Sequence, residues 1–266
     1  MNSFAPDPIE PGNAPDPAPF RIASYNVHKC VGTDLRRDPD RTARVIQELG
    51  ADIVALQEAD RRFGDRAGLL DLAALHERTG LTPVPVDVPG RSHGWHGNLI
   101  LLRDAEVESV EPITLPGLEP RGALMVDLHR AGQPLRVIAA HLGLLRHSRL
   151  QQARALNRIL QDRETRPTLL MGDLNEWRLT RRSSLAPLMP HAPRTLVPSF
   201  PARRPLLALD RILACPRTDL LEMESHVSPL SRVASDHLPV KARVRLRAEA
   251  QPAPESDPVP QQVRGV

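Results

Sequence analysis

The chain has 266 residues, of which 41% are apolar, and it carries a formal net charge of +3 at pH 7. This apolar content supports a sizeable hydrophobic core, and because the motifs described below are spread along most of the chain, we expect one large domain. The two cysteines, Cys30 and Cys215, have no C-x-x-C partner, which argues against a disulfide framework and a structural zinc site.

The sequence lacks the usual signals of secretion or membrane insertion. No run approaches the roughly 18 apolar residues of a membrane span, and the first residues form neither a basic n-region nor an apolar h-region. We therefore expect a cytoplasmic monomer. Lysine occurs only at Lys29 and Lys241, so the basic side chains are almost all arginine. This bias suits bidentate phosphate contacts, or it reflects the composition of the source genome.

Proline recurs through residues 1–19 without apolar periodicity, and residues 247–266 have a similar character. Such segments bury too little apolar surface to offset the entropy of ordering. Both are predicted to be disordered tails, and the folded domain is predicted over residues 20–246.

Between the tails, apolar strands alternate with amphipathic helices. The first strand is predicted over residues 20–25, and a helix follows with Asp38 as its N-cap and Gly50 as its stop signal. In chain order, the later elements are a strand from residue 53, a helix between residues 66 and 79, strands over 98–102, 123–128 and 135–140, a helix over 148–161, and strands over 168–172 and 238–244.

Several of these strands succeed one another without an intervening helix. This order argues against a purely parallel sheet and for a mixed one. Residues 238–245 alternate cleanly between apolar and polar side chains, so this strand is predicted to bury one face and expose the other. The pattern predicts an α/β domain built on a mixed sheet.

Polar residues stand at the ends of the apolar runs. Asp173 and Asn175 follow the run that begins at Thr168, Glu58 follows a nearly continuous apolar strand, and His141 ends another. Carboxylates, amides and histidines at strand ends can converge on one rim of a sheet, where a divalent metal and a phosphate can be held together. This pattern predicts a metal-dependent phosphoester hydrolase.

Each of these residues also has an ordinary structural explanation. Glu58 fits a surface acid at a strand end as well as a metal ligand, and Asn26 is a common turn residue. His141 fits a satisfied, half-buried histidine, and residues 235–237 fit a polar turn. Asp210 lies within apolar sequence and needs a partner, for which a histidine is suited. Their joint occurrence favours a catalytic site.

Six short motifs occur in order along the chain: Ser24 to His28, Leu56 to Glu58, Ala140 to Leu142, Gly172 to Asn175, Leu209 to Ile212 and Ser235 to His237. Together they resemble the motif series of the endonuclease/exonuclease/phosphatase superfamily, the group of DNase I, exonuclease III-type AP endonucleases, inositol polyphosphate 5-phosphatases and neutral sphingomyelinases. The resemblance spans residues 20–246. The ordered set is specific, although no single motif is.

The resemblance implies a fold and a cofactor. The fold is a four-layer α/β sandwich, in which two mixed β-sheets pack face to face with helices outside. The cofactor is Mg²⁺ or Mn²⁺, with Glu58 as the principal ligand and Asn26 and Asp236 near the metal. A hard cation with oxygen ligands and several waters fits these residues better than zinc.

The resemblance also assigns catalytic roles. Asp173 would orient or deprotonate the attacking water, and Asn175 would hold that water or a phosphoryl oxygen. His237 would donate to the phosphate while Asp210 fixes its tautomer, and His141 would lie on the phosphate or leaving-group side. The sequence leaves open whether Asp173 or the pair of His237 and Asp210 is the general base.

The substrate is the least determined part of the prediction. A serine hydrolase is disfavoured because no Gly-x-Ser-x-Gly elbow is present. Nucleic acid is favoured, while a small phosphoester, a phospholipid headgroup and a non-catalytic binding role remain as alternatives. The preference rests on arginines in loops expected to border the metal: Arg61, Arg62, Arg66, Arg121, Arg178, Arg181, Arg182, Arg203 and Arg204.

Overall fold

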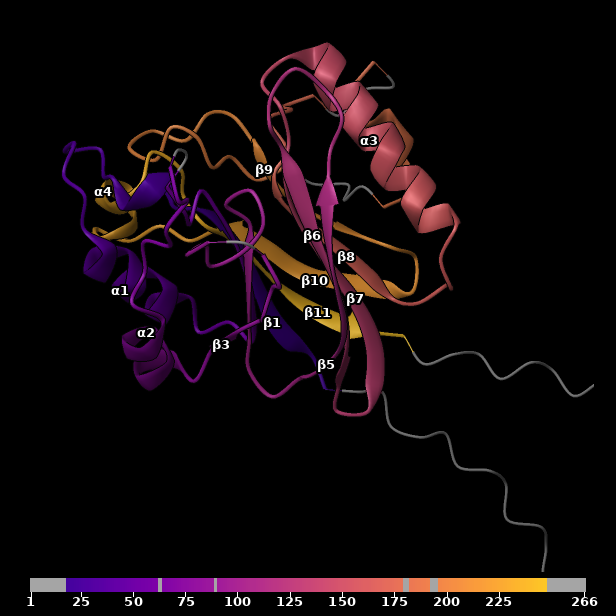
Figure 1. Cartoon of the computed structure of the whole chain (residues 1–266), viewed down its shortest axis with the longest axis horizontal. Helices are drawn as coiled ribbons and strands as arrows, with labels where there is room; N and C mark the ends of the chain where they lie inside the picture. Colours follow the sequence, from indigo (N-terminus) through magenta and orange to yellow (C-terminus); the bar gives the residue numbers. More distant parts are fainter. Residues whose placement is uncertain (1–17, 62–63, 89, 179–181, 192–195, 248–266) are drawn as a thin grey trace, which may run out of the picture.

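The computed structural model describes residues 18–61, 64–88, 90–178, 182–191 and 196–247. Within these ranges the strands form two mixed sheets that pack face to face (Figure 1). The predicted tails lie outside the described ranges, apart from residues 18, 19 and 247 at their inner ends.

The six-stranded sheet contains the first and the last strand of the domain. Its order is β10 (Thr218–Ser225), β11 (Val240–Leu246), β1 (Phe20–Asn26), β2 (Ile53–Gln57), β4 (Leu99–Leu102) and β3 (Thr82–Pro83). The five-stranded sheet has the order β5 (Glu106–Thr114), β6 (Gly122–Arg130), β7 (Gln133–His141), β8 (Thr168–Asp173) and β9 (Asp210–Ala214). The pairs β1 with β2 and β7 with β8 are parallel and the other pairs are antiparallel, so both sheets are mixed.

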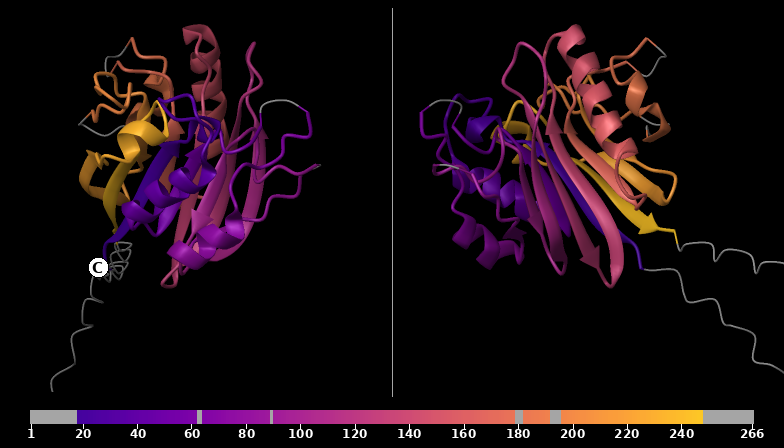
Figure 2. Two further views of the ribbon diagram at one scale, coloured as in Figure 1. Left: turned by 90° about the vertical axis from the view of Figure 1, so that its left-hand side faces the viewer. Right: turned by 45° about the vertical axis from the view of Figure 1, so that its right-hand side comes forward.

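Helices cover the outer faces of both sheets, as the two views in Figure 2 show. On the six-stranded side lie α1 (Pro39–Leu49), α2 (Leu72–Thr79) and the short α4 (Ser231–Ala234), with the 3-10 helix η1 (His28–Cys30). On the five-stranded side lie α3 (Arg146–Gln161) and the 3-10 helix η2 (Ala186–His191).

Three hydrophobic clusters separate the four layers. The central cluster lies between the sheets and includes Ile22 from β1 and Val126 from β6. Ala23, the next residue of β1, points to the opposite face and packs in the cluster that contains Ile46 of α1. Leu156 of α3 belongs to the third cluster, on the outer face of the five-stranded sheet. Both faces of the central strands are therefore buried, which explains their nearly continuous apolar runs. The predicted four-layer sandwich is confirmed.

Local signals fix the ends of α1 as predicted. The Asp38 side chain accepts a hydrogen bond from the Arg41 N–H at 2.9 Å, which satisfies one of the unpaired donors of the first turn. Gly50 ends the helix with a φ of 54°, a left-handed conformation that favours glycine.

The predicted start of α2 is wrong. The helix was expected to begin near residue 66, but it begins at Leu72, because the Asp71 side chain accepts from the Ala74 N–H at 3.0 Å and acts as the N-cap. Upstream, Asp60 and Gly68 form an isolated β-bridge, and Arg66 has a φ of 49°. This segment is therefore a loop, and it borders the site described next.

Four strands at sheet edges were not predicted: the short β3 and β9, and the longer β5 and β10. The burial pattern of β5 is mostly exposed, and Glu106, Glu108 and Glu111 remove the apolar alternation that marks a strand. Each of these strands hydrogen-bonds to one neighbour only. Polar edge strands are common because they discourage pairing with another chain, and their sequences reveal little.

Candidate functional site

One end of the six-stranded sheet carries the three predicted metal ligands. β1 and β2 are parallel and end side by side, since Asn26 pairs with Gln57, so Asn26 and Glu58 leave the sheet at the same edge. β11 runs antiparallel to β1 and begins at this edge, and Asp236 lies just before it. The Ser235 hydroxyl donates to the Asn26 carbonyl at 2.7 Å and ties these two segments together.

The adjacent end of the five-stranded sheet carries acidic and basic groups. His141, the last residue of β7, pairs with Asp173, the last residue of β8. Asp173 in turn pairs with Asp210, the first residue of β9, which is antiparallel to β8. Three strands therefore deliver His141, Asp173 and Asp210 to one edge, and all three residues are buried.

Hydrogen bonds across the gap between the sheets join these two edges. The Asn26 carboxamide Nδ2 donates to Asp173 Oδ2 at 2.9 Å. His237 Nδ1 donates to Asp210 Oδ2 at 2.7 Å, and His237 Nε2 lies 3.7 Å from Asp173 Oδ2. Ligand atoms of Asp173, Asp210 and His237 all lie within 4.8 Å of one another. Residues as distant in sequence as Asn26 and His237 thus meet in one place.

The side chains of His237 and Asp210 are both buried, and the neighbouring carboxylates shift the pKa of His237. Burial alone lowers the pKa of His237, but the carboxylate of Asp210, together with Asp173 and Asp236, raises it to about 10. His237 is therefore an imidazolium at neutral pH. The Ser199 hydroxyl also donates to Asp210 Oδ2, at 2.5 Å. Ser199 was not predicted, because nothing in its sequence context marks it as a partner of Asp210.

Asp173 and Asn175 occupy a tight turn after β8. The Asn175 N–H donates to Asp173 Oδ1 at 3.1 Å, and the Asn175 Nδ2 donates to the Leu142 carbonyl at 3.0 Å. The Leu142 N–H donates in turn to the Asp173 carbonyl at 3.0 Å. Asn175 has a φ of 52°, a left-handed conformation that asparagine tolerates better than most residues. These bonds hold the Asp173 carboxylate in one orientation.

His141 is a hydrogen-bond acceptor. Arg121 Nη1 lies 2.9 Å from His141 Nε2, and since a guanidinium only donates, Nε2 carries the lone pair. Burial, followed by the repulsion of Arg121, lowers the pKa of His141 to about 3, although Asp173 opposes this shift. His141 is therefore neutral, and it orients Arg121 at the mouth of the site.

Two residues without a predicted role lie against the predicted metal ligands. The Lys29 ammonium forms a very short ion pair with Glu58 Oε2. His28 Nδ1 lies 3.6 Å from Asp236 Oδ1. His28, Lys29 and Glu58 all have left-handed φ values, between 47° and 56°, which turn their side chains toward this edge. The rarity of lysine in this chain is the one sequence signal that could have drawn attention to Lys29.

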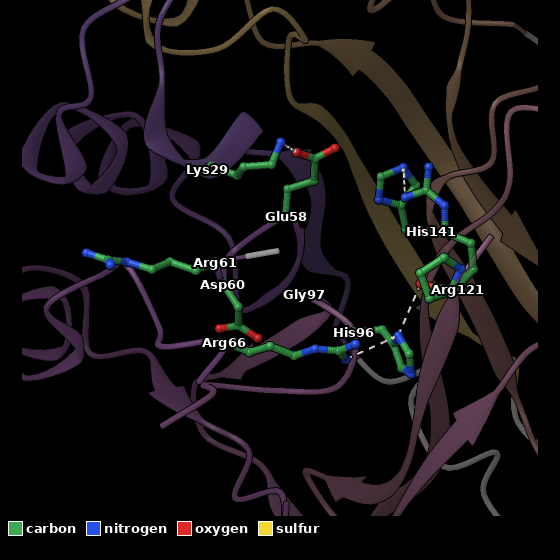
Figure 3. A pocket seen from close by; sticks show the side chains of 10 residues that line it. Lys29, Glu58, Asp60, Arg61, Arg66, His96, Gly97, Arg121 and His141 are labelled. Atoms are coloured by element: carbon green, nitrogen blue, oxygen red, sulfur yellow. Dashed lines mark hydrogen bonds and ion pairs between the residues drawn. The ribbon is translucent and has the colours of Figure 1, made fainter. Parts of the chain in front are cut away.

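A pocket opens beside Glu58 (Figure 3). It shares Glu58 and His141 with the joined edges and continues between three loops. Its lining residues are Lys29, Glu58, Asp60, Arg61, Arg66, His96, Gly97, Pro120, Arg121 and His141. Basic side chains outnumber acidic ones in this lining, so the pocket suits an anion.

The sequence profile of the Endonuclease/Exonuclease/phosphatase family matches residues 23–237. The chain belongs to this family. The match confirms the family predicted from the six motifs. Enzymes of the family are phosphoester hydrolases and generally depend on a divalent metal. No curated protein sequence gives a significant match.

Solved structures of endonuclease/exonuclease/phosphatase proteins share the fold. One from Beutenbergia cavernae is 24% identical with a TM-score of 0.63, and the match covers 86% of this chain and 72% of that one. D. rerio TDP2, complexed with a single-strand DNA product, is 18% identical with a TM-score of 0.64, covering 86% and 99%. A Bacteroides thetaiotaomicron mannosyl-6-phosphatase is 17% identical with a TM-score of 0.63, covering 85% and 99%. At these identities the likeness shows the fold alone.

The donor atoms at the six-stranded edge fit the divalent metal that the endonuclease/exonuclease/phosphatase family implies. Glu58 and Asp236 offer carboxylate oxygens and Asn26 offers a carboxamide oxygen, which are the ligands of a hard cation. Lys29 already places a positive charge against Glu58. Cys30, in the same segment, is buried, and burial raises its pKa to about 11, so it offers no thiolate to a softer metal.

The arginines predicted to form a rim around the endonuclease/exonuclease/phosphatase site do not act alike. Arg61, Arg66 and Arg121 line the pocket beside Glu58. Arg203 instead donates to Thr33 Oγ1 at 3.0 Å. The remaining positions divide into Arg178, Arg182 and Arg204, which are exposed, and Arg62 and Arg181, which lie outside the described residues.

No helix of the described residues is long and apolar enough to cross a membrane.

Proposed function

We propose that this chain is a divalent-metal-dependent phosphoester hydrolase in which water attacks phosphorus, and that its substrate is a phosphodiester of nucleic acid. The observation that carries the proposal is the joining of the two sheet edges by the bonds from Asn26 to Asp173 and from His237 to Asp210. These bonds bring oxygen donors for a metal within reach of a buried acid and base.

The six-stranded edge is the proposed metal site. Glu58 would hold Mg²⁺ or Mn²⁺, with Asn26 and Asp236 beside it. When bound, such a cation neutralises charge on the phosphoryl oxygens and lowers the pKa of bound water. The Lys29 ammonium forms an ion pair with the Glu58 carboxylate, and both side chains line the pocket.

Asp173 is the proposed general base. The carboxylates around His237 favour its imidazolium form, so the Asp173 carboxylate, which lies between Asn26 and His237, is the better placed proton acceptor. Asp173 takes the proton of the attacking water as the new oxygen–phosphorus bond forms. The ester bond breaks, and its electron pair stays on the leaving oxygen.

The remaining side chains stabilise the phosphoryl group. His237 Nε2 carries a proton and can donate to a phosphoryl oxygen, while Asp210 holds its other nitrogen. Asn175 is held in place by Leu142 and orients Asp173 through its backbone N–H. His141 is neutral and acts through Arg121, whose guanidinium it positions toward the substrate.

Two observations support nucleic acid as the substrate class. Arg61, Arg66 and Arg121 line the pocket next to the proposed reaction site, and guanidinium groups bind phosphates in a bidentate manner. Trp177, two residues after Asn175, is 46% exposed, with the Arg178 guanidinium 5.6 Å from its ring centroid. An exposed indole can stack on a base. The structural likeness to TDP2 bound to single-strand DNA product supports the same class.

A small phosphoester is the second candidate, because the mannosyl-6-phosphatase from Bacteroides thetaiotaomicron has a similar fold. The test is a panel of single-stranded DNA, duplex DNA, chromogenic phosphodiesters and sugar phosphates, assayed with Mg²⁺, Mn²⁺ or EDTA. We expect hydrolysis of diesters with either metal and none in EDTA. Full activity in EDTA would contradict the proposal, and hydrolysis of sugar phosphates alone would assign the small-substrate alternative.

DNA binding separates the two candidates independently of turnover. For the Asp173→Asn variant, affinity for DNA should fall steeply between about 50 and 200 mM salt, with a log–log slope of roughly −0.9 per neutralised phosphate on a duplex. A small-molecule enzyme should show a shallow response and competition by inorganic phosphate. A flat salt response would remove DNA as the proposed substrate.

A further inference from the structure

The pocket beside Glu58 contains two side chains, Arg66 and His96, that the hydrolytic step does not use, next to Arg121, which it does. Figure 3 shows Arg66 reaching toward the His96 imidazole, while Arg121, which also lines the pocket, reaches toward His141. Burial lowers the pKa of His96, and the positive charges of Arg66 and Arg121 lower it further. Two guanidinium groups that line one pocket favour the binding of an anion there.

The Arg66 guanidinium has no acceptor among the residues that the structure describes. Its polar contact is His96 Nδ1, at 3.5 Å, but the same nitrogen lies 3.1 Å from the Pro120 carbonyl. One nitrogen cannot donate to a carbonyl and accept from a guanidinium at once, and the shorter contact assigns the proton to Nδ1. The contact between Arg66 and His96 is therefore an approach of two donors, and Arg66 can still bind an external acceptor.

The loop that presents His96 is firmly held. Trp95 and Asn98 form a β-bridge, and Asn98 Nδ2 donates to the carbonyls of Trp95 and Gly122, both at 3.0 Å. Trp95 Nε1 donates to the Ile113 carbonyl at 2.9 Å. A Cβ atom added to Gly122 would lie 2.8 to 2.9 Å from the rings of Trp95 and His96, so this close packing requires glycine. His96 is thus presented by fixed backbone.

The two acids in the pocket lining are engaged elsewhere. Asp60 accepts from the Ser92 hydroxyl at 2.5 Å and from the His93 N–H at 3.0 Å. Glu58 is paired with Lys29. Neither acid pairs with Arg66 in the described part of the chain, so the Arg66 guanidinium has no ion-pair partner there.

We propose that Arg66, together with Arg121 at the edge of the reaction site, forms a subsite beside the His96 imidazole for a second phosphate group of the same substrate, next to the phosphate that is hydrolysed. The inference rests on the proposed function, because the subsite adjoins the proposed reaction site through Glu58 and His141. The second phosphate can come from the neighbouring linkage of a nucleic-acid backbone or from a small molecule that carries two phosphates. In both cases the phosphate oxygens accept charge-assisted hydrogen bonds that the Arg66 guanidinium donates.

Binding of reaction-product analogues tests the subsite without turnover. We would titrate the protein calorimetrically with thymidine 3′,5′-bisphosphate, thymidine 3′-phosphate and thymidine 5′-phosphate. The bisphosphate should bind on the order of tenfold to a hundredfold more tightly than either monophosphate, as expected for added charge-assisted hydrogen bonds. Arg66→Ala should remove most of this advantage, and Arg66→Lys should keep part of it because it preserves the charge but not the fork.

Arg154→Ala is the matched control. Arg154 is an exposed arginine on α3, away from the pocket, so this variant loses the same charge. It should keep the full preference for the bisphosphate. Equal affinities of the wild-type protein for bisphosphate and monophosphates would overturn the subsite, as would an equal loss in Arg154→Ala and Arg66→Ala.

Kinetics identify the source of the second phosphate. The substrates are DNA trinucleotides in which the linkage next to the cleaved one is a native phosphate or a neutral methylphosphonate, and 4-nitrophenyl phosphodiesters of thymidine with and without a second phosphate. A higher kcat/KM for the native trinucleotide than for the methylphosphonate, with no such difference among the thymidine esters, assigns a nucleic-acid backbone. A higher kcat/KM for the thymidine ester that carries a second phosphate assigns a small bisphosphorylated substrate. Hydrolysis of every member at the same kcat/KM would contradict the subsite and leave the proposed hydrolase intact.

Discussion

The two sheet edges that meet at the site differ in how much of each side chain reaches solvent. On the six-stranded edge, the side chains of Glu58 and Asp236 are 22% and 38% exposed. On the five-stranded edge, the side chains of Asp173 and Asp210 are 3% and 0% exposed. Both edges carry carboxylates, but in opposite environments.

This difference assigns distinct tasks to similar groups. The buried carboxylates are fixed by hydrogen bonds, which keeps proton-transfer groups in position before substrate arrives. The exposed carboxylates can exchange water for a cation without the large desolvation cost of a buried charge. The six-stranded edge, here called the open edge, therefore suits a metal and substrate. The five-stranded edge, here called the closed edge, suits the acid–base chemistry.

Removing the charge of the closed edge should have the largest effect. Asp173→Asn keeps the shape of the side chain but removes the proposed base, so kcat should fall on the order of a hundredfold or more. The measurement is steady-state hydrolysis of a chromogenic phosphodiester, with circular dichroism to confirm folding. Asp162→Asn, at an exposed position after α3, is the isosteric control and should keep wild-type turnover. Near-normal turnover of Asp173→Asn would show that Asp173 is not the base.

Removing a carboxylate of the open edge should change the metal dependence. Glu58→Gln should raise the Mg²⁺ or Mn²⁺ concentration for half-maximal activity by about tenfold or more. Even substitutions of residues that only hydrogen-bond to metal ligands lower the affinity for the metal by that factor. A metal titration of activity measures the shift. Glu164→Gln is the control, because the Glu164 side chain is 81% exposed and lies away from the site. An unchanged metal response of Glu58→Gln would remove this residue from the metal site.

A third buried acid, Glu176, follows the strand that carries Asp173, and its loss should lower stability in a pH-dependent way. Burial raises the pKa of Glu176, but hydrogen bonds from Ser184 and Arg178, with the charge of Arg149, hold it below its ordinary value of 4.5. A lowered folded-state pKa gives stability that is present above about pH 4.5 and lost as the pH falls through the folded pKa.

Urea unfolding of the wild-type protein and Glu176→Gln at several pH values between about 3 and 7 measures this contribution. At neutral pH the variant should be less stable by about 1.5 to 3 kcal/mol, the usual range for hydrogen bonds to a charged group. The difference should shrink toward acidic pH. Parallel stability curves would show that the ionised form of Glu176 contributes nothing.

The smallest effect is expected at the ends of the chain. We propose that the folded domain comprises residues 20–246 and that both proline-rich segments are dispensable, because they have too little apolar surface to offset the entropy of ordering. A chain trimmed to residues 19–247 should keep its activity and its thermal midpoint to within a few degrees. A larger drop in the midpoint would show that one of the segments docks on the domain.

The sequence predicted most of the strands because their apolar runs are buried on both faces, as in β1 and β2, and it predicted α1 because Asp38 and Gly50 cap it. Edge strands such as β5 were missed because their polar residues face solvent and their pairing is a tertiary event. The start of α2 was misplaced because the N-cap signal of Asp71, with Gly68 upstream of it, was not recognised.

The site was only partly accessible from the sequence. Strand ends marked Glu58 and Asp173, but spacing along the chain does not reveal that two sheets bring Asn26 to Asp173, and the family resemblance supplied that expectation. The protonation states of His141 and His237 depend on burial and on their neighbours, which no motif encodes. Ser199 and Lys29 became visible as partners only in the folded chain.

Hydrolysis in water enriched in oxygen-18 tests the central claim most directly. A phosphodiester is incubated with Mg²⁺ and the wild-type protein, and the phosphate-bearing product is analysed by mass spectrometry. Attack of water on phosphorus predicts one labelled oxygen in each product phosphate, in an amount that falls with turnover in Asp173→Asn and vanishes in EDTA. Product without label on phosphorus, or label that forms equally in EDTA, would contradict metal-dependent attack of water at the joined edges.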